Sequence, residues 1–303
     1  MDTIRLQRLD ETAIPALLSL AASVGWEYSA EDLRTMFASG IFFGHTTADR
    51  RVVSSAAIFP YGDKLASLGM VIVSEQYRGR GLGKAVTRQC IEAVRGGTPI
   101  MLVATAAGVP LYERLGFRTV ETIEKLLCDR YQPPAETDRS ADGMRDGRIP
   151  DGCLPRHLAA SYRLRPLAAD DVEAVIALDE AAVGARRNAL LRARLTQAAR
   201  SAVIRHADGS IAGFGLAVQR GSRLTIGPLV APDAELALAL IDYLAGEHQG
   251  TLRMDIPSGL HELSVGLVQR GFRQMGQPPV MMTGADRLPY NHTLFALASM
   301  AFG

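Results

Sequence analysis

Apolar and polar positions recur with two different periods along the first part of the chain. Residues 4–9 alternate with a period of two, which indicates a half-buried strand, whereas the apolar residues of 14–24 follow helical spacing. The β-rich runs 52–59 and 65–73 flank the turn Tyr61-Gly62-Asp63-Lys64, which predicts an antiparallel hairpin. Later segments predict a helix from Gly81, a strand at 100–104, a short helix at 109–114 and a strand at 117–127. This order predicts a mixed α/β fold with one strand-to-helix crossover.

The second part of the chain repeats short pieces of the first at a nearly constant distance. Three matches support this: Ile4-Arg5-Leu6 with Tyr162-Arg163-Leu164 and Leu68-Gly69 with Ile226-Gly227, each 158 residues apart, and Gly116-Phe117-Arg118 with Gly271-Phe272-Arg273, 155 apart. Matches that stay in register predict a duplicated fold. Residues 129–160 are rich in Pro, Gly and alternating charge, which is typical of a linker. We expect a first copy at 1–130, a linker at 131–160 and a second copy at 161–303.

Composition narrows the class of protein. The 303 residues suit two domains, and 48% hydrophobic with 21% charged residues excludes a disordered chain. The 33 Lys and Arg residues balance 32 Asp and Glu residues, so the net charge of +1 gives no reason to expect nucleic acid as a partner. No run reaches the roughly 18 apolar residues of a membrane span, and the first residues lack a secretory pattern. We expect a cytoplasmic protein without a membrane partner.

The cysteines and histidines do not form a metal or disulfide pattern. Cys90, Cys128 and Cys153 lack C-x-x-C spacing, and the six histidines are scattered along the chain. A disulfide framework needs an even set of cysteines, and a zinc site needs closely spaced ligands. We therefore expect neither a structural disulfide nor a bound metal.

Glycines and basic residues gather where the hairpin's second strand gives way to the next helix. Glycine allows a positive φ and lets a ligand approach the backbone, and the first turn of a helix offers unpaired N–H groups to an anion. Arg78, Arg80 and Lys84 add positive charge beside these glycines. The segment therefore predicts a pyrophosphate site, although a tight turn without a ligand is the alternative.

Spacing separates the known phosphate-binding motifs. A dinucleotide fingerprint needs glycine where this chain has Lys84, and a P-loop needs glycine where it has Arg78. The remaining pattern, R-x-x-G-x-G from Arg78 to Gly83, resembles the acetyl-CoA signature of the GNAT superfamily of N-acetyltransferases. The segment from Leu111 to Phe117 resembles the superfamily's second motif, and the tandem repeat resembles its two-domain members.

The resemblance implies a GNAT-like mixed sheet with flanking helices and a set of roles in the first copy. The strand Val71, Ile72, Val73 would pair with the pantetheine arm, and an amide near Val71 would polarise the thioester carbonyl. The pyrophosphate would lie against Arg78, Gly79, Arg80, Gly81, Leu82, Gly83 and Lys84. Tyr112 stands where the family places the acid that protonates the departing CoA sulfur; its alternative is a core tyrosine that closes the short helix.

The acceptor side has weaker signals. An alkyl amine is mostly protonated at neutral pH, so a proton must leave it before attack. Residues 65–73 contain no carboxylate, and Glu75, Asp63 and Glu27 are candidates that read more readily as surface charges, so removal through water is an equal alternative. Trp26 follows the first helix, where the superfamily builds its acceptor pocket, and core packing is its alternative. Trp26 and Glu27 are the substrate-side candidates.

The second copy lacks these motifs. A shift of 158 residues places 236–241 over the glycine cluster, without a glycine or arginine, and Leu267 stands in place of Tyr112. We expect this copy to shape the acceptor pocket or to mimic a dimer contact. Its helix at 234–244 should pack rather than bind. Residues 255–257 and 261–262 could face a cleft, but we favour a position on the surface. The apolar tail 294–302 should form a last buried strand or a packing helix.

These observations favour an acetyl-CoA-dependent N-acyltransferase. The first copy would transfer an acetyl group to a primary amine by direct attack in a ternary complex. A CoA-binding sensor or interaction module that keeps the fold without turnover is the alternative. The acceptor could be a small metabolite, an antibiotic, an amino acid or a protein terminus, and acyl length and oligomeric state are open.

Overall fold

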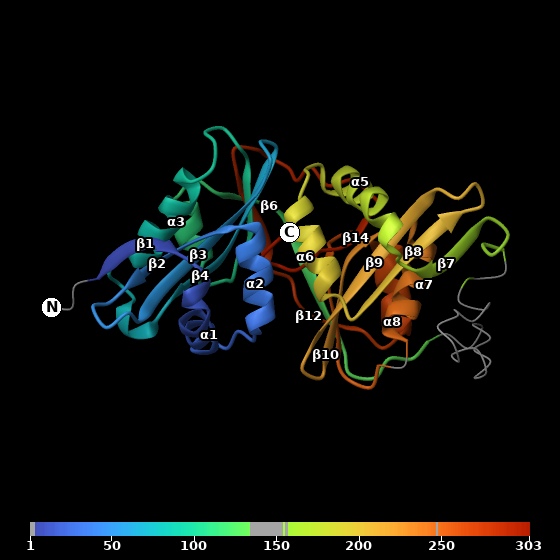
Figure 1. The fold of residues 1–303 in the computed structure, drawn as a ribbon, viewed down its shortest axis with the longest axis horizontal. Coiled ribbons are helices and arrows are strands. Elements are labelled where there is room, and N and C mark those ends of the chain that lie inside the picture. Colours follow the sequence, from blue (N-terminus) through green and yellow to red (C-terminus); the bar gives the residue numbers. More distant parts are fainter. Residues whose placement is uncertain (1–3, 134–153, 155–156, 247) are drawn as a thin grey trace.

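Two α/β halves lie side by side in the computed structural model, which describes residues 4–133, 154, 157–246 and 248–303 (Figure 1). The first half contains β1 (Arg5–Leu9), α1 (Ile14–Ala22), α2 (Ala30–Ser39), β2 (Ile41–Thr46), β3 (Val52–Tyr61), β4 (Leu65–Val73), α3 (Leu82–Glu92), β5 (Ile100–Val103), α4 (Val109–Glu113) and β6 (Arg118–Cys128). The second half contains β7 (Tyr162–Pro166), α5 (Val172–Val183), α6 (Asn188–Gln197), β8 (Arg200–His206), β9 (Ile211–Arg220), β10 (Arg223–Val230), α7 (Ala234–Ala245), β11 (Leu252–Pro257), α8 (His261–Gln269), β12 (Arg273–Gly276), β13 (Pro279–Thr283) and β14 (Leu294–Ala296). Short 3₁₀ helices η1 (Glu11–Ala13), η2 (Glu75–Tyr77) and η3 (Ala169–Asp171) complete the described elements.

The order of elements is the same in both halves up to their last strands, which confirms the predicted mixed α/β fold in tandem. Helix α2, which was not predicted, begins at a capping box: the Asp32 amide donates to the Ser29 hydroxyl at 3.0 Å, and the Ser29 amide donates to the Asp32 carboxylate at 3.0 Å. The predicted linker 131–160 lies mostly outside the described residues, so the boundaries at 130 and 161 stay a prediction.

The halves exchange strands within one sheet. The beginning of β6 pairs with β13 from the second half, with Glu121 opposite Val280, and β13 also pairs with β5. The end of β6 crosses into the second half and pairs with both β11 and β12, with Leu126 opposite Met254 and Gln274. The sheet therefore runs through fourteen strands, in the order β1-β2-β3-β4-β5-β13-β6-β11-β10-β9-β8-β7 with β12 on β6 and β14 on β10. Each half contains a strand that the other half supplies.

The carboxyl-terminal residues lie between the two halves (Figure 1). The Tyr61 hydroxyl donates to the Phe302 carbonyl at 2.6 Å, and the Ser67 hydroxyl donates to the Ala301 carbonyl at 3.0 Å. From the second half, the Arg194 guanidinium donates to the Ala298 carbonyl at 2.6 Å. Residues 294–302 are buried apart from a partly exposed Met300, and 294–296 form a strand, which confirms the prediction of a last buried strand.

A buried ion pair also joins the halves where α2 packs on α6. Asp32 on α2 is 1% exposed and accepts hydrogen bonds from Arg220 on β9 at 2.8 and 2.9 Å and from Gln197 on α6 at 2.8 Å. Burial alone would raise the pKa of Asp32, but the Arg220 guanidinium and the Ser29 amide hold that pKa below its usual value. The carboxylate is therefore charged at neutral pH and fixes the position of α2 against the second half.

Candidate active site

A gap between β4 and β5 opens the sheet of the first half. The two strands pair in parallel only at Ala66 with Ile100 and at Ser67 with Met101, although β4 continues to Val73. Met70, three residues further along, has a φ of +55°, and its carbonyl accepts a hydrogen bond from the Ser55 hydroxyl at 2.8 Å. A positive φ is unusual for a side-chain-bearing residue, and here it accompanies a shift in the register between β3 and β4. Backbone groups of β4 beyond Ser67 are thus left without a partner on the β5 side.

The loop that follows β4 brings the predicted pyrophosphate residues together at the start of α3. Gly79 and Gly81 have φ values of +77° and +75°, and a Cβ at either position would meet no atom within 4 Å. The glycines are therefore explained by backbone conformation rather than by crowding. Gly81 is the N-cap of α3 and provides no capping side chain, so the first-turn amides have no side-chain acceptor. Exposed Arg78, Arg80 and Lys84 surround this helix start, with Arg80 above the Tyr77 ring at 5.1 Å.

A cavity of about 460 Å³ lies at the gap and is lined by both halves. The first half contributes β4, the end of β5, the segment before α2, and Tyr112 on α4. The second half contributes side chains of β9, β10 and β11 and the tail at Ser299, Met300 and Ala301. The cavity therefore joins the open edge of β4 to polar side chains that come from the second half.

Tyr112 is 8% exposed and faces this cavity. Its ring packs edge-on against Phe117 with the centroids 6.0 Å apart, and its phenol has no hydrogen bond to another described residue. Burial raises the pKa of Tyr112, and the nearby Cys90 raises it further. The hydroxyl therefore keeps its proton at neutral pH and can donate it into the cavity.

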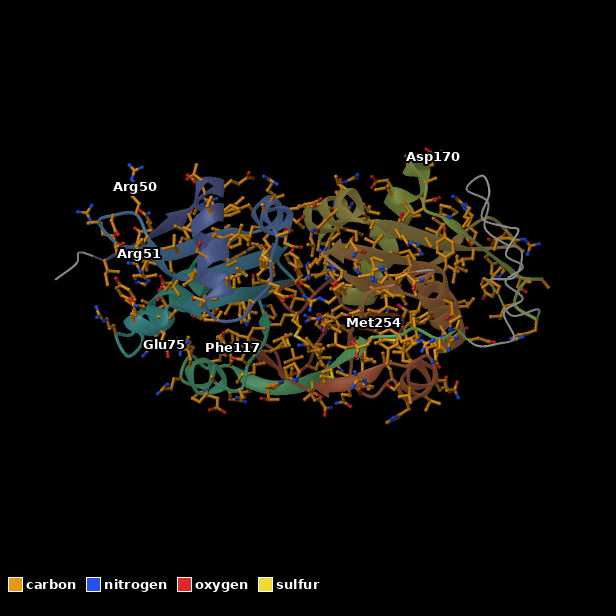
Figure 2. All side chains as sticks on the ribbon, turned by 90° about the horizontal axis from the view of Figure 1, so that it is seen from below. Arg50, Arg51, Glu75, Phe117, Asp170 and Met254 are labelled. Carbon is orange, nitrogen blue, oxygen red and sulfur yellow. The ribbon has the colours of Figure 1, made fainter. Side chains whose placement is uncertain are left out.

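The structure separates the acceptor-side candidates. Trp26 and Glu27 both line the cavity. Asp63 instead pairs with Arg95 at 2.6 Å on the surface, and Glu75 lies at the outer surface of the first half (Figure 2). Glu27 has a side chain that is 79% exposed and forms an ion pair with Arg223. Of Glu75, Asp63 and Glu27, the three carboxylates considered as a base, only Glu27 lines the cavity.

Sequence reasoning missed most of the polar lining. It named none of the lining residues Lys125, Arg220, Arg223 and Arg253. For Asp255 it favoured the surface, which is wrong, over the alternative of a cleft position, which the structure shows. Asp255 is 2% exposed and accepts two hydrogen bonds from Arg253, at 2.9 and 3.1 Å. The available signal was a charged residue at alternate positions within an apolar strand, as at Arg253 and Asp255. The prediction that His261 and Glu262 are exposed is confirmed.

The corresponding site of the second half is filled by its own chain. Asp233 is the N-cap of α7, and its carboxylate accepts a hydrogen bond from the Leu236 amide at 2.8 Å, so a side chain occupies the helix start. Strand β14 pairs with β10, with Leu229 opposite Ala296, and the Leu297 amide donates to the Asp255 carbonyl of β11 at 2.9 Å. This segment lies where the gap between β4 and β5 lies in the first half.

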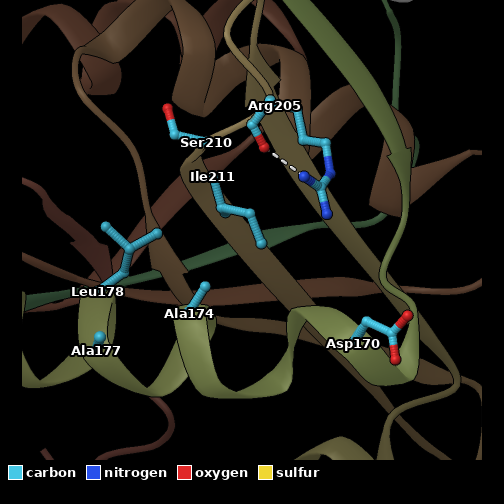
Figure 3. A pocket seen from close by; sticks show the side chains of 8 residues that line it. Asp170, Ala174, Ala177, Leu178, Arg205, Ser210 and Ile211 are labelled. Atoms are coloured by element: carbon cyan, nitrogen blue, oxygen red, sulfur yellow. Dashed lines mark hydrogen bonds between the residues drawn. The ribbon is translucent and has the colours of Figure 1, made fainter.

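Another hollow lies between α5 and the turn from β8 to β9 (Figure 3). Its lining is mostly small or apolar, and Arg205 already forms an ion pair with the buried Asp171 and donates to the Gly209 carbonyl. Within the described ranges, no three His, Cys, Asp or Glu residues group as metal ligands, and no helix has the length and hydropathy to cross a membrane.

Comparisons with known proteins agree with this geometry. Two family models described as an acetyltransferase (GNAT) domain match residues 40–119 and 175–296. The uncharacterized N-acetyltransferase YitH of Bacillus subtilis strain 168 is 31% identical over 306 residues, and the match covers 100% of both chains. A putative acetyltransferase from Pyrococcus horikoshii has a TM-score of 0.75 at 18% identity, over 99% of this chain and 96% of its own. A tandem GNAT protein from the clavulanic acid biosynthesis pathway has a TM-score of 0.63 at 16% identity, over 93% and 98%.

Both halves thus match the same family, and the full-length relative extends the match from end to end. The chain is a tandem member of the GNAT superfamily and is an N-acetyltransferase.

Proposed function

We propose that the first half binds acetyl-CoA and that the acetyl group passes directly to a primary amine held in the cavity. One observation carries this proposal: the open edge of β4, Tyr112 and the polar side chains of the second half line a single cavity. A donor on the β4 side and an acceptor on the second-half side would meet in front of Tyr112. Direct attack in a ternary complex needs this arrangement and no acylated residue of the protein.

The donor residues proposed here lie in the first half. The unpaired edge of Val71, Ile72 and Val73 suits an extended amide-containing arm, which would add to the sheet as a strand does. The helix start at Gly81 suits a pyrophosphate, because its amides have no side-chain acceptor and three cationic side chains stand beside it. In the second half, Asp233 and β14 occupy the equivalent places, which supports assigning the chemistry to the first half.

The proposed reaction moves two protons and exchanges two bonds. The amine nitrogen attacks the thioester carbonyl carbon, the C–N bond forms, and the C–S bond breaks. The amide of Val71 would stabilise the negative charge that develops on the carbonyl oxygen. Tyr112 gives its proton to the departing sulfur and recovers one from the new amide nitrogen through water. Burial raises the pKa of the Tyr112 phenol. A thiolate expelled into the same buried surroundings would likewise have a raised pKa, which would favour its protonation.

The amine itself would lose its first proton to water. The two carboxylates that line the cavity, Glu27 and Asp255, are ion-paired with Arg223 and Arg253. Each of these carboxylates is already bound by a guanidinium group. Neither is therefore assigned the role of general base.

Calorimetric titration with acetyl-CoA and continuous measurement of free CoA thiol with a panel of amines test the proposal together. Gly81→Ala should weaken acetyl-CoA binding at least tenfold, because the methyl group enters the space in front of the helix start. Gly259→Ala is the matched control: Gly259 lies in the second half, has a φ of +88° and equally open surroundings, so the backbone strain is similar. Equal losses of affinity in both variants, or no amine-dependent thiol release by the wild-type protein, would contradict the proposal.

A further inference from the structure

Cationic side chains dominate the second-half side of the cavity. Lys125 on β6, Arg220 on β9, Arg223 on β10 and Arg253 on β11 line it, whereas Glu27 and Asp255 are the lining carboxylates. These four cations come from four adjacent strands of the continuous sheet. Their convergence on one cavity is therefore a product of the strand exchange, which brings β6 between β11 and β12.

Ion pairing accounts for part of this charge. Arg253 binds Asp255, Arg223 binds Glu27, and Arg220 binds Asp32 behind the cavity wall. The side chains of the three arginines retain 13–26% exposure, so their guanidinium groups are not enclosed by these pairs. A planar guanidinium has five N–H donors, and one carboxylate uses two of them. Donors remain for a ligand.

Lys125 has no carboxylate partner within the described residues. It is partly buried, and burial lowers the pKa of its ammonium group, with Arg253 lowering that pKa further and Asp255 opposing the change. A cation that is partly desolvated and repelled by a neighbouring guanidinium is stabilised by an anion brought between the two. Asp255 lies opposite Lys125 in the register of β6 and β11 and is bound by Arg253, so Lys125 and Arg253 are neighbouring cations of the cavity lining that share one carboxylate.

Arg194 adds a further positive charge behind the wall. It is 1% exposed, it hydrogen-bonds to Gln197 and the Ala298 carbonyl rather than to a carboxylate, and its Nε has no partner. Burial and the nearby Arg220 lower the pKa of Arg194 to about 9, so it is still charged at neutral pH. With Arg194 and Asp32 included, five described cations face three carboxylates around this end of the cavity. Two of these cations, Lys125 and Arg194, therefore have no carboxylate partner of their own among the described residues, and Arg194 is held instead by Gln197, the Ala298 carbonyl and the Phe302 ring.

We propose that the acceptor is a small primary amine that also carries an acidic group, a carboxylate or a phosphate, which binds between Lys125 and Arg253 while its amine faces Tyr112. This inference rests on the proposed function and assigns its substrate class. The cavity of about 460 Å³ is of the size that holds a small molecule, and both ends of such an acceptor would contact lining residues. The acidic group orients the amine, and the arginine pairs keep the binding groups in place before the substrate enters.

Matched pairs of amines test this substrate class. The pairs are 4-aminobutyrate with butylamine, and O-phosphoethanolamine with ethanolamine, assayed by CoA thiol release. We expect kcat/KM to be at least tenfold higher for the acidic member of at least one pair, and the pair with the larger ratio distinguishes carboxylate from phosphate. Glutarate and inorganic phosphate, which have no amine, serve as binding probes by calorimetry and as competitors against the amine.

Lys125→Met removes the central charge without leaving a carboxylate unpaired. It should raise KM for the acidic amine at least tenfold with kcat little changed, leave the neutral amine unaffected, and abolish binding of the preferred probe. Lys125→Arg should restore both readouts. Arg273→Gln is the control. Arg273 is an exposed arginine of the second half that pairs with Asp129, so this substitution removes one positive charge away from the cavity.

The possible results separate this inference from the proposed function. Thiol release with neutral or polycationic amines only, or an equal effect of Lys125→Met on both members of each pair, would overturn the inference and leave acetyl transfer by the first half standing. Absence of thiol release with every amine would overturn both.

Discussion

Replacing Tyr112 by phenylalanine separates chemistry from stability. The phenol makes no hydrogen bond to another described residue, so its loss leaves no buried group unsatisfied, and we expect the free energy of unfolding to change by less than about 0.5 kcal/mol. General acid catalysis contributes about 10²–10⁴-fold to a rate, which corresponds to about 3–5 kcal/mol in the activation barrier. Tyr112→Phe should therefore lower kcat by two to four orders of magnitude, while acetyl-CoA affinity measured by calorimetry stays within about twofold.

The matched control is Tyr61→Phe. Tyr61 is also buried, but its hydroxyl donates to the Phe302 carbonyl at 2.6 Å and lies away from the cavity lining. Removal of the Tyr61 hydroxyl leaves the buried Phe302 carbonyl unsatisfied, which should lower the free energy of unfolding by about 1–3 kcal/mol. Urea unfolding measures this loss, and kcat should change little. A Tyr112→Phe enzyme with wild-type kcat would refute the acid role. A Tyr112→Phe enzyme as destabilised as Tyr61→Phe would show that Tyr112 is a core residue.

Three more outcomes follow from the contacts described. Asp32→Asn should destabilise the protein by about 3–5 kcal/mol at neutral pH, because Arg220 loses its buried partner. Since the pKa of Asp32 is lowered in the folded protein, its contribution is present above the unfolded pKa of about 3.9 and is lost as pH falls through the folded value. The difference between wild type and variant should thus shrink below about pH 4, and a constant difference would contradict it. Phe302→Ala should cost about 3–5 kcal/mol by urea unfolding, because Phe302 is 1% exposed and packs edge-on against Phe59 at 4.8 Å; a loss below about 1 kcal/mol would show that the tail is not part of the core. Finally, both cavity carboxylates are paired with arginine, so no protein base is expected to deprotonate the amine. The pH at which kcat/KM levels off should therefore follow the pKa of each acceptor amine. A plateau at the same pH for amines of different pKa would instead indicate a general base.

Local sequence patterns predicted the parts of the candidate site whose residues are close together in the sequence. The glycines at 79 and 81 were identified because positive φ and a helix start leave a signature within a few residues, and Tyr112 because it stands at a fixed distance from Gly116 in the second motif. The hairpin of β3 and β4 was predicted for the same reason, since period and turn are local.

The part of the cavity that the second half lines could not be predicted in this way. Lys125 and Arg253 lie in strands more than a hundred residues apart, and only the pairing of β6 with β11 brings them to one cavity. Asp255 was placed on the surface because a lone carboxylate is usually solvated, whereas here Arg253 compensates its charge and allows burial. The polar positions were visible in the sequence, but the fact that they line one cavity depends on the register between strands of the two halves.

The exchange of β6 and β13 between the halves affects how the protein unfolds. If residues 1–133 were cut from the rest, β5 and the beginning of β6 would lose the strand between them, and two unprotected edges would face water. The remaining fragment would lose its own inserted strand at the same time. The polypeptide should accordingly melt in a single cooperative transition, because neither half keeps a complete sheet without the other.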